Sequence, residues 1–182
     1  MVGMTVVERH AGPWTREQRD ALPDDGRTYE LIDGMLVVNP APTRRHQSVV
    51  VWLVEALMAA RPEHLRVLTS PVDVVTNTGS VFQPDVIVVR AEERDDVMSV
   101  PLLAVEVLSP SNRGYDLVDK REQYERAGIQ SYWVIDPERA ELIAWELRDG
   151  GYVEVVRVSG QDPFGAQHPF PLTIVPAEIT RP

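Results

Sequence analysis

The sequence contains no cysteine, and of its 18 basic residues only Lys120 is a lysine. Without cysteine there is no disulfide framework and no cysteine-based zinc site. Long apolar runs are missing as well: residues 97–105 form a run of nine, whereas a helix that spans a bilayer needs about 20. The amino terminus has no positively charged segment followed by an apolar core. We therefore expect a cytoplasmic protein without a membrane segment.

Positive charge is scarce: 18 basic residues against 28 acidic ones give a formal net charge of −10. This charge repels phosphate backbones at long range and excludes non-specific coating of nucleic acid. Any contact with nucleic acid must then be local or bridged by cations. The best local excess of positive charge lies in residues 42–68, where Arg44, Arg45 and His46 begin an expected helix. These three residues either contact a phosphate or form an ordinary solvated helix end.

Motifs of several common enzyme classes are also absent. The sequence has no HExxH, P-loop, GxGxxG or GxSxG segment. These absences exclude zinc proteolysis, P-loop nucleotide hydrolysis and serine-hydrolase chemistry.

What is present predicts an α/β fold, a mixed sheet flanked by helices with additional hairpins. We expect one domain over residues 1–182, with a core at about 15–158 and a Pro-rich tail at 159–182. The helices are expected at 15–22, 43–60 and 113–127, and the strands at 28–32, 35–39, 67–75, 84–89, 102–108, 131–136, 141–147, 152–158 and 172–175. The expected helix starts are a capping box of Thr15 and Gln18, a cap at Thr43, and a cap at Ser111 or Asn112, and Gly128 is expected to end the last helix. Asp33-Gly34 is the expected turn of the first hairpin. Strands 102–108 and 131–136 should be parallel neighbours joined by a right-handed crossover. The helix at 43–60 carries more apolar surface than one core-facing stripe needs, so it is either enclosed in the core or part of a subunit interface.

The most informative residue is Glu106, in the otherwise apolar strand expected over 102–108. Because both faces of this strand are apolar, the carboxylate has apolar neighbours whichever face is covered. A buried carboxylate is costly unless a cation, a hydrogen-bond donor or a proton stabilises it. Glu106 is therefore either part of a functional site or half of a structural salt bridge to an arginine.

Asp85 is the second candidate, directly after Pro84 and before the apolar run at 86–89. Alone, it could do no more than accept hydrogen bonds within a turn. If two adjacent strands bring it close to Glu106, the pair offers oxygen ligands suited to Mg²⁺ or Mn²⁺.

Lys120 is expected on the helix after the Glu106 strand, four residues beyond Asp116 and four before Tyr124, so the three share one helical face. It either forms a surface ion pair with Asp116 or serves a site through its ammonium, whose pKa is tunable as that of arginine is not. Its being the only lysine favours the second interpretation. Glu30, in the hairpin expected at 28–39, is either a further metal ligand or the polar residue of a half-exposed hairpin.

Six segments carry these residues in order along the chain. They are YELIDG at 29–34, PAPTRRH at 40–46, QPDVIVV at 83–89, VEVLSPSN at 105–112, DLVDKREQY at 116–124 and SYWVIDP at 131–137. Together they resemble the PD-(D/E)XK nuclease superfamily and, more closely, the Uma-two family of restriction-endonuclease-like proteins. The resemblance covers about residues 15–147.

The resemblance implies a restriction-endonuclease-like fold, dependence on Mg²⁺ or Mn²⁺, and hydrolysis of phosphodiester bonds in nucleic acid, with DNA as the expected substrate. By resemblance, Asp85 and Glu106 are the two metal-binding acids and Glu30 is the upstream acid. The superfamily places its lysine two residues after the second acid, where this chain has Leu108. The resemblance therefore assigns the catalytic lysine to Lys120, displaced onto the next helix.

In the predicted mechanism, the metal lowers the pKa of a water molecule, and Lys120 orients that water or stabilises the developing negative charge. Asp116 and Tyr124 are expected to contact the metal-binding and catalytic residues without binding the metal themselves. The alternative is a non-catalytic domain of the same fold that acts through protein association, as the apolar helix at 43–60 suggests. That helix, together with the resemblance, also points to a homodimer.

Overall fold

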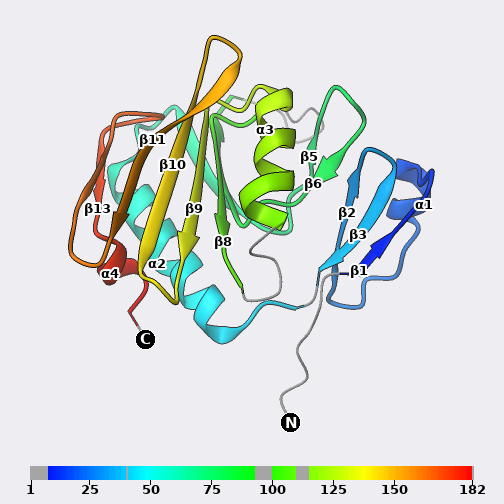
Figure 1. Ribbon diagram of the computed structural model, residues 1–182, viewed down its shortest axis with the longest axis horizontal. Coiled ribbons are helices and arrows are strands. Elements are labelled where there is room, and N and C mark those ends of the chain that lie inside the picture. Colours follow the sequence, from blue (N-terminus) through cyan, green and yellow to red (C-terminus); the bar gives the residue numbers. More distant parts are fainter. Residues whose placement is uncertain (1–7, 40, 93–99, 110–114, 182) are drawn as a thin grey trace.

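The computed structural model describes residues 8–39, 41–92, 100–109 and 115–181, with the backbone alone at residues 8 and 115–117 (Figure 1). Its main elements are a six-stranded and a five-stranded sheet that lie next to each other (Figure 1). Helices pack on the larger sheet, so the α/β class predicted from the sequence is confirmed. Within the described part of the chain, no helix is long and apolar enough to cross a bilayer.

The six-stranded sheet forms the larger part of the molecule. Its order is β11 (Gly151–Ser159), β10 (Glu141–Arg148), β9 (Ser131–Asp136), β8 (Leu103–Val107), β7 (Val86–Arg90) and β4 (Leu65–Thr69). Strand β8 is parallel to β9 and antiparallel to β7. It therefore lies inside the sheet with a neighbour on each side, as its apolar sequence predicts.

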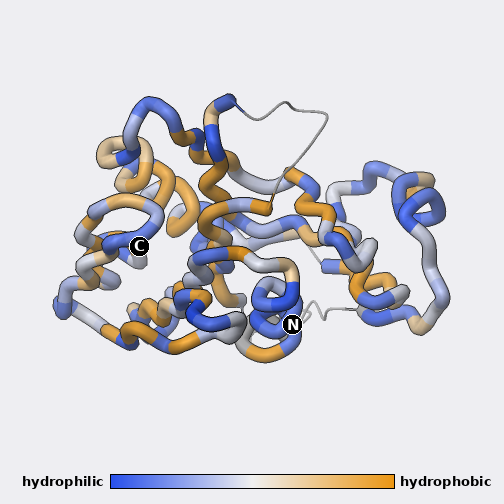
Figure 2. Tube along the Cα trace, turned by 90° about the horizontal axis from the view of Figure 1, so that it is seen from above, coloured by the Kyte–Doolittle hydropathy of each residue, from blue (hydrophilic) through white to orange (hydrophobic). Residues whose placement is uncertain are grey.

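The five-stranded sheet contains the early hairpin. Its order is β1 (Glu8–His10), β3 (Met35–Asn39), β2 (Thr28–Ile32), β6 (Val81–Phe82) and β5 (Val74–Val75). The predicted hairpin is confirmed, with Asp33 and Gly34 at positive φ in the turn between β2 and β3. Near this sheet, α1 (Arg16–Asp20) starts at the predicted capping box of Thr15 and Gln18. The α1 end of the molecule is mostly hydrophilic (Figure 2).

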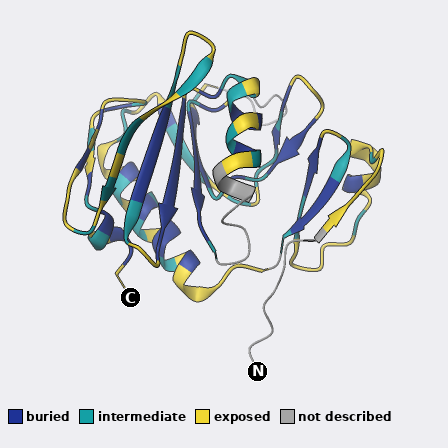
Figure 3. Ribbon diagram, viewed as in Figure 1, coloured by how far each residue is buried: buried dark blue, intermediate teal, exposed yellow. Residues whose placement is uncertain are grey.

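Two helical segments cover opposite faces of the six-stranded sheet (Figure 1). On one face, α2 (Arg44–Ala60), capped by Thr43, buries Val49, Leu53 and Leu57. On the other face lies α3 (Arg121–Ala127), which follows the π-helical turn η1 (Tyr115–Lys120). Gly128 ends α3 in the left-handed conformation, at φ 80°, as predicted. The central strands are buried along their length (Figure 3).

Residues 65–90 differ from the prediction of two long strands, 67–75 and 84–89. The first is divided into β4 and β5, whereas the second corresponds to β7 and is preceded by β6, a separate strand that was not predicted. Strands β4 and β7 pair in the larger sheet, and β5 and β6 pair in the smaller one. The chain therefore crosses from one sheet to the other after β4 and returns before β7. Alternation of side chains cannot reveal such a crossing, since the strands before and after it are mostly apolar. Asp85 lies on the return crossing.

Three further segments were not predicted from the sequence. They are strands β1 and β12 (Phe164–Ala166) and helix α4 (Pro176–Ile179), whereas β13 (Leu172–Ile174) was predicted and pairs with β12. Phe164, Ile174 and Ile179 join the apolar cluster under α2. Segments this short carry weak local signals and are ordered by tertiary burial. The helix start predicted at Ser111 or Asn112 lies outside the described residues.

Candidate active site

The predicted acidic residues and the lysine come together where the two sheets meet. Glu30 comes from β2 of the smaller sheet, and Glu106 comes from β8 in the middle of the larger one. Lys120 ends η1, and Tyr124 follows one turn later in α3. All four side chains are buried. The junction thus assembles residues that are far apart in the sequence.

Lys120 bridges the two glutamates. Its Nζ donates a hydrogen bond to Oε1 of Glu106 over 2.9 Å and lies 3.1 Å from Oε1 of Glu30. The Tyr124 hydroxyl donates to the same Glu106 oxygen over 2.7 Å. Glu106 is therefore paired with the lysine, not with an arginine as in the structural alternative. The side chain of Asp116, the other partner considered for Lys120, lies outside the described residues.

The surroundings of Glu106 favour its protonated form. Burial, together with the charges of Asp85 and Glu30, raises the pKa of this carboxyl to about 7 against the opposing effect of the Lys120 ammonium. Burial and the charge of Glu106 also raise the pKa of Tyr124 well above its ordinary value. Tyr124 thus remains a neutral phenol, whose hydroxyl keeps its proton and donates a hydrogen bond to the glutamate.

Glu30 is fully buried, although a half-exposed hairpin was one of the two expectations for it. The backbone N–H of Gln83 donates to its Oε1 over 2.9 Å, and the Asn39 amide donates to its Oε2 over 2.8 Å. Both oxygens of Glu30 therefore already have partners, one of them shared with Lys120. As a metal ligand, Glu30 remains a prediction.

Asp85 is attached to two different elements. The backbone N–H of Val107 in β8 donates to Asp85 Oδ2 over 2.8 Å, and Nε2 of His46 in α2 lies 3.0 Å from the same oxygen. His46 is buried, so it is not the solvated histidine that the sequence suggested. Although burial opposes its protonation, the hydrogen bond and charge of Asp85 raise the pKa of His46 above the ordinary value. Asp85 thus binds strand β8, which carries Glu106. This agrees with the expectation that two adjacent strands bring Asp85 and Glu106 close together.

The donor set was tested for its fit to Mg²⁺ or Mn²⁺. Among the described residues, no three His, Asp or Glu side chains form a group that could by itself hold a metal ion. Asp85, whose side chain is 18% exposed, accepts at Oδ2 only, and Glu106 accepts at Oε1 only, within the part of the chain described. This leaves Oδ1 of Asp85 and Oε2 of Glu106 as oxygen donors. Two carboxylates fit Mg²⁺, which commonly keeps several waters and takes one or two protein carboxylates.

The three residues predicted to contact nucleic acid have different surroundings. Arg44 and Arg45 are exposed at the start of α2, but Arg45 donates a hydrogen bond to the carbonyl of Pro137. His46 faces Asp85 instead of the surface. The contact of Arg44 and Arg45 with a phosphate stays a prediction.

Sequence reasoning missed Asn39 and Gln83, both of which bind Glu30. Asn39 could have been found, because the hairpin pairs Glu30 with Val37 and places Asn39 on the same face two residues further along β3. Gln83 acts through its backbone N–H, for which the sequence offers no signal.

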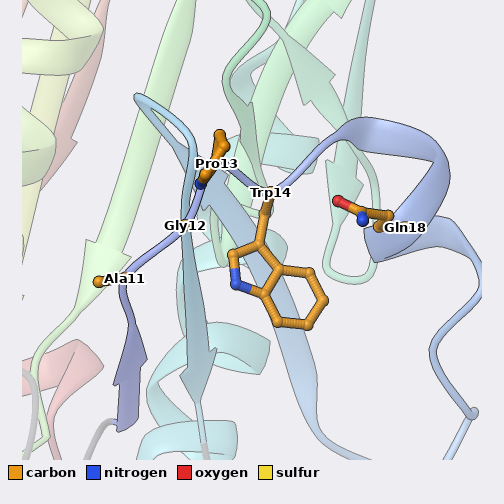
Figure 4. Close-up of a pocket in the computed structure, with 5 residues that line it drawn as sticks. All are labelled: Ala11, Gly12, Pro13, Trp14 and Gln18. Carbon is orange, nitrogen blue, oxygen red and sulfur yellow. The ribbon is translucent and has the colours of Figure 1, made fainter.

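A surface hollow of about 410 Å³ lies elsewhere, beside α1 (Figure 4). It is lined by Ala11, Gly12, Pro13, Trp14 and Gln18. None of these side chains titrates near neutral pH or is a common metal ligand. We therefore place the candidate site at the carboxylates and not in this hollow.

Comparison with known proteins identifies the family and the fold of the chain. A model of the Uma2 family, described as "Putative restriction endonuclease", matches residues 16–178. A crystal structure from Anabaena variabilis, titled as a "putative nuclease belonging to DUF820", is similar in fold with a TM-score of 0.72. It is 17% identical to this chain, and the match covers 92% of this chain and 98% of the other. No curated protein that was compared matches the chain. Because the family model spans nearly the whole sequence, the chain belongs to the Uma2 family, whose description is that of a restriction endonuclease.

Proposed function

We propose that this protein is a metal-dependent nuclease that hydrolyses phosphodiester bonds, with DNA as its expected substrate. The observation that carries the proposal is the buried Lys120, which joins Glu106 to Glu30 beside Asp85 at the junction of the two sheets. Membership in a family described as restriction endonucleases supports the same activity.

Asp85 and Glu106 are the residues we assign to Mg²⁺ or Mn²⁺. Each has one carboxylate oxygen bound by protein donors and one oxygen left for the ion. When Glu106 is ionised, its carboxylate and those of Asp85 and Glu30 outnumber the Lys120 ammonium. A divalent cation would be attracted to this excess of negative charge and would in turn favour the ionised form of Glu106. Bound there, the ion would lower the pKa of a water molecule and offset negative charge on the phosphate.

Lys120 is the group we assign to the reacting atoms. An ammonium positioned by two carboxylates can donate hydrogen bonds to the attacking water or to a phosphate oxygen as negative charge develops. Glu30 and Tyr124 are positioning residues: Glu30 holds the ammonium, and the Tyr124 hydroxyl fixes the Glu106 oxygen that faces it. The supporting role of Asp116 remains a prediction.

Metal binding tests this proposal before the substrate is known. Mn²⁺ is titrated calorimetrically into the wild type and into Asp85→Asn and Glu106→Gln, substitutions that keep the side-chain volume. We expect binding in the wild type and a loss of at least about tenfold in affinity in either variant. Arg157→Ala, at an exposed ion pair with Glu154 on β11, is the matched control and should bind as the wild type does.

Cleavage then tests the activity. Wild type and Lys120→Met are incubated with double-stranded DNA, single-stranded DNA and RNA, with Mg²⁺ or with a chelator. We expect cleavage that requires the metal and falls by about 10²-fold or more in Lys120→Met, because the electrostatic stabilisation is lost. A Lys120→Met protein that cleaves at the wild-type rate would remove the lysine from the mechanism.

A second candidate function is protein association through α2. Val51 is 62% exposed and Met58 is 46% exposed, one above the other on the outer side of the helix. The predicted homodimer would use this surface. If the chain self-associates in sedimentation experiments and Val51→Asp makes it monomeric without unfolding it, the interaction function gains support. Leu53 is unsuitable for this test, because it is buried against the sheet.

A further inference from the structure

The segment Gln83-Pro84-Asp85 leads from the smaller sheet to the larger one and is attached at both of its ends. At the far end, Asp85 is bound by His46 and by the backbone of Val107. At the near end, the Gln83 side chain donates from Nε2 to Oδ1 of Asp73 over 2.7 Å. Its backbone N–H meanwhile binds Glu30. Gln83 thus connects the surroundings of Glu30, which its backbone N–H binds, with those of Asp85, which follows two residues later in the chain.

Asp73 is itself bound by an arginine. Nη1 and Nη2 of Arg19 donate to the two Asp73 oxygens over 2.5 and 2.6 Å, which is the bidentate geometry of an arginine–carboxylate fork. The Arg19 side chain is only 8% exposed. Its Nε donates to the carbonyl of Tyr29, the residue before Glu30 in β2. The fork therefore joins α1 and β2 to the loop before β5.

These bonds form one continuous series. It runs from Arg19 through Asp73 to the Gln83 side chain, and from the Gln83 backbone to Glu30 and Lys120. Arg19, Glu30 and Lys120 in this series are buried, whereas Asp73 and Gln83 are partly exposed. The buried members are costly to displace, because movement leaves a buried donor or acceptor without a partner. Pro84 has a fixed φ, so a displacement of Gln83 is transmitted to Asp85.

We propose that Arg19, Asp73 and Gln83 are positioning residues, which set the location of Asp85 and of Glu30 from outside the site. The α1 region, whose sequence shows no catalytic motif, then has a defined task in the enzyme. The inference rests on the proposed function only in that Asp85 is taken as a metal ligand. The placement of Asp85 can also be measured without metal.

The test compares the wild type with Gln83→Ala and Asp73→Asn in the full chain. Gln83→Ala removes the side-chain amide but keeps the backbone N–H that binds Glu30. The ring nitrogens of the four histidines are observed by ¹⁵N NMR in the absence of metal. We expect the His46 signals to move in both variants, because His46 contacts Asp85, while the signals of exposed His168 stay in place.

Mn²⁺ calorimetry on the same proteins gives the second readout. We expect about a tenfold loss of affinity in Gln83→Ala, the effect typical of residues that orient a metal ligand. In the Asp73→Asn, Gln83→Ala double variant the loss should be no greater than the larger single loss, since both act through one series. Arg157→Ala breaks a comparable fork to Glu154 on β11 and should change neither readout.

The outcomes separate this inference from the proposed function. Unchanged His46 signals in both variants, with Mn²⁺ affinities within about twofold of wild type, overturn the positioning role. Absence of Mn²⁺ binding in the wild type, or wild-type binding in Asp85→Asn, overturns the proposed function. In that case the His46 signals still decide whether Gln83 and Asp73 place Asp85. Urea unfolding of each variant confirms that the comparison is made between folded proteins.

Discussion

The two faces of the six-stranded sheet are built from the same strands but bury different chemistry. Under α2, the β8 residues Leu103, Val105 and Val107 pack into an apolar cluster. Under α3, the same strand presents Ala104 and Glu106, and Leu108, the residue after the strand, is buried on the same side. One face is closed by apolar contact, and the other encloses a lysine and two carboxylates.

This difference agrees with the proposal that the α2 face serves stability and the α3 face serves function. Apolar burial contributes about 25 cal/mol per Å², whereas a buried ion pair often stabilises no more than apolar side chains of the same volume. A structural requirement alone would therefore have been met by apolar residues on both faces. The charged cluster on the α3 face is the site that we propose, and the apolar face behind it is closed by contact with α2.

The largest effect is expected from removing the lysine alone. Lys120→Met leaves Glu106 and Glu30 buried without their cation, which should lower the free energy of unfolding by about 3–5 kcal/mol. Urea denaturation measures the loss. Adding Glu30→Gln and Glu106→Gln to Lys120→Met should restore most of it, because the uncompensated charge is gone. A triple variant no more stable than Lys120→Met would show that the cost has another origin.

A comparable loss, but without any effect on metal binding, is expected on the α2 face. Leu53→Ala opens a cavity in a fully buried position and should cost about 2–5 kcal/mol. Mn²⁺ affinity of the folded variant, measured well below its melting temperature, should stay at the wild-type value. Val51→Ala, at an exposed position of the same helix, is the control and should change stability by less than about 0.5 kcal/mol. Weakened Mn²⁺ binding in Leu53→Ala would mean that the two faces are coupled.

The pH dependence of stability separates the faces further. Burial raises the pKa of Glu106 from 4.5 in the unfolded chain to about 7, so between these values the folded state binds more protons. The associated stability is present in full below about pH 4.5 and is lost as the pH rises through 7, to a total of at most about 3 kcal/mol. Glu106→Gln should lose the part of the decline that Glu106 causes and keep the part due to His46, whose pKa is also raised, as chemical denaturation between pH 5 and 8 can show. An equal decline in the variant would assign it to another group.

The smallest effect is expected from an exposed ion pair at the border of the site. Arg9 of β1 lies 2.7 Å from Asp119, the neighbour of Lys120, and both side chains are nearly half exposed. Arg9→Ala should cost less than about 1 kcal/mol, because water solvates the separated charges. Thermal melting at low and high salt measures this cost. A loss as large as that of Lys120→Met would show that the η1 turn depends on β1 for its position.

Much of the fold follows from local patterns in the sequence. The Asp33-Gly34 turn, the Thr15 and Thr43 caps and Gly128 each specify a local conformation, and all are found where they were predicted. The crossing between the sheets at 65–90 could not be predicted, because it depends on which strand each segment pairs with. Of the site, residue types and order identified Glu106, Asp85 and Lys120 as candidates, whereas the sequence offered no sign of the bond between His46 and Asp85.

The sequence by itself determined which residues are chemically unusual: a carboxylate in an apolar strand, an aspartate after a proline, and one lysine among arginines. Only the tertiary structure decided that the lysine pairs with both glutamates and that the Gln83 backbone binds one of them. The physical reason is that burial is a property of the assembled sheets. Before β2, β8 and η1 come together, Glu30, Glu106 and Lys120 are solvated by water and do not require partners.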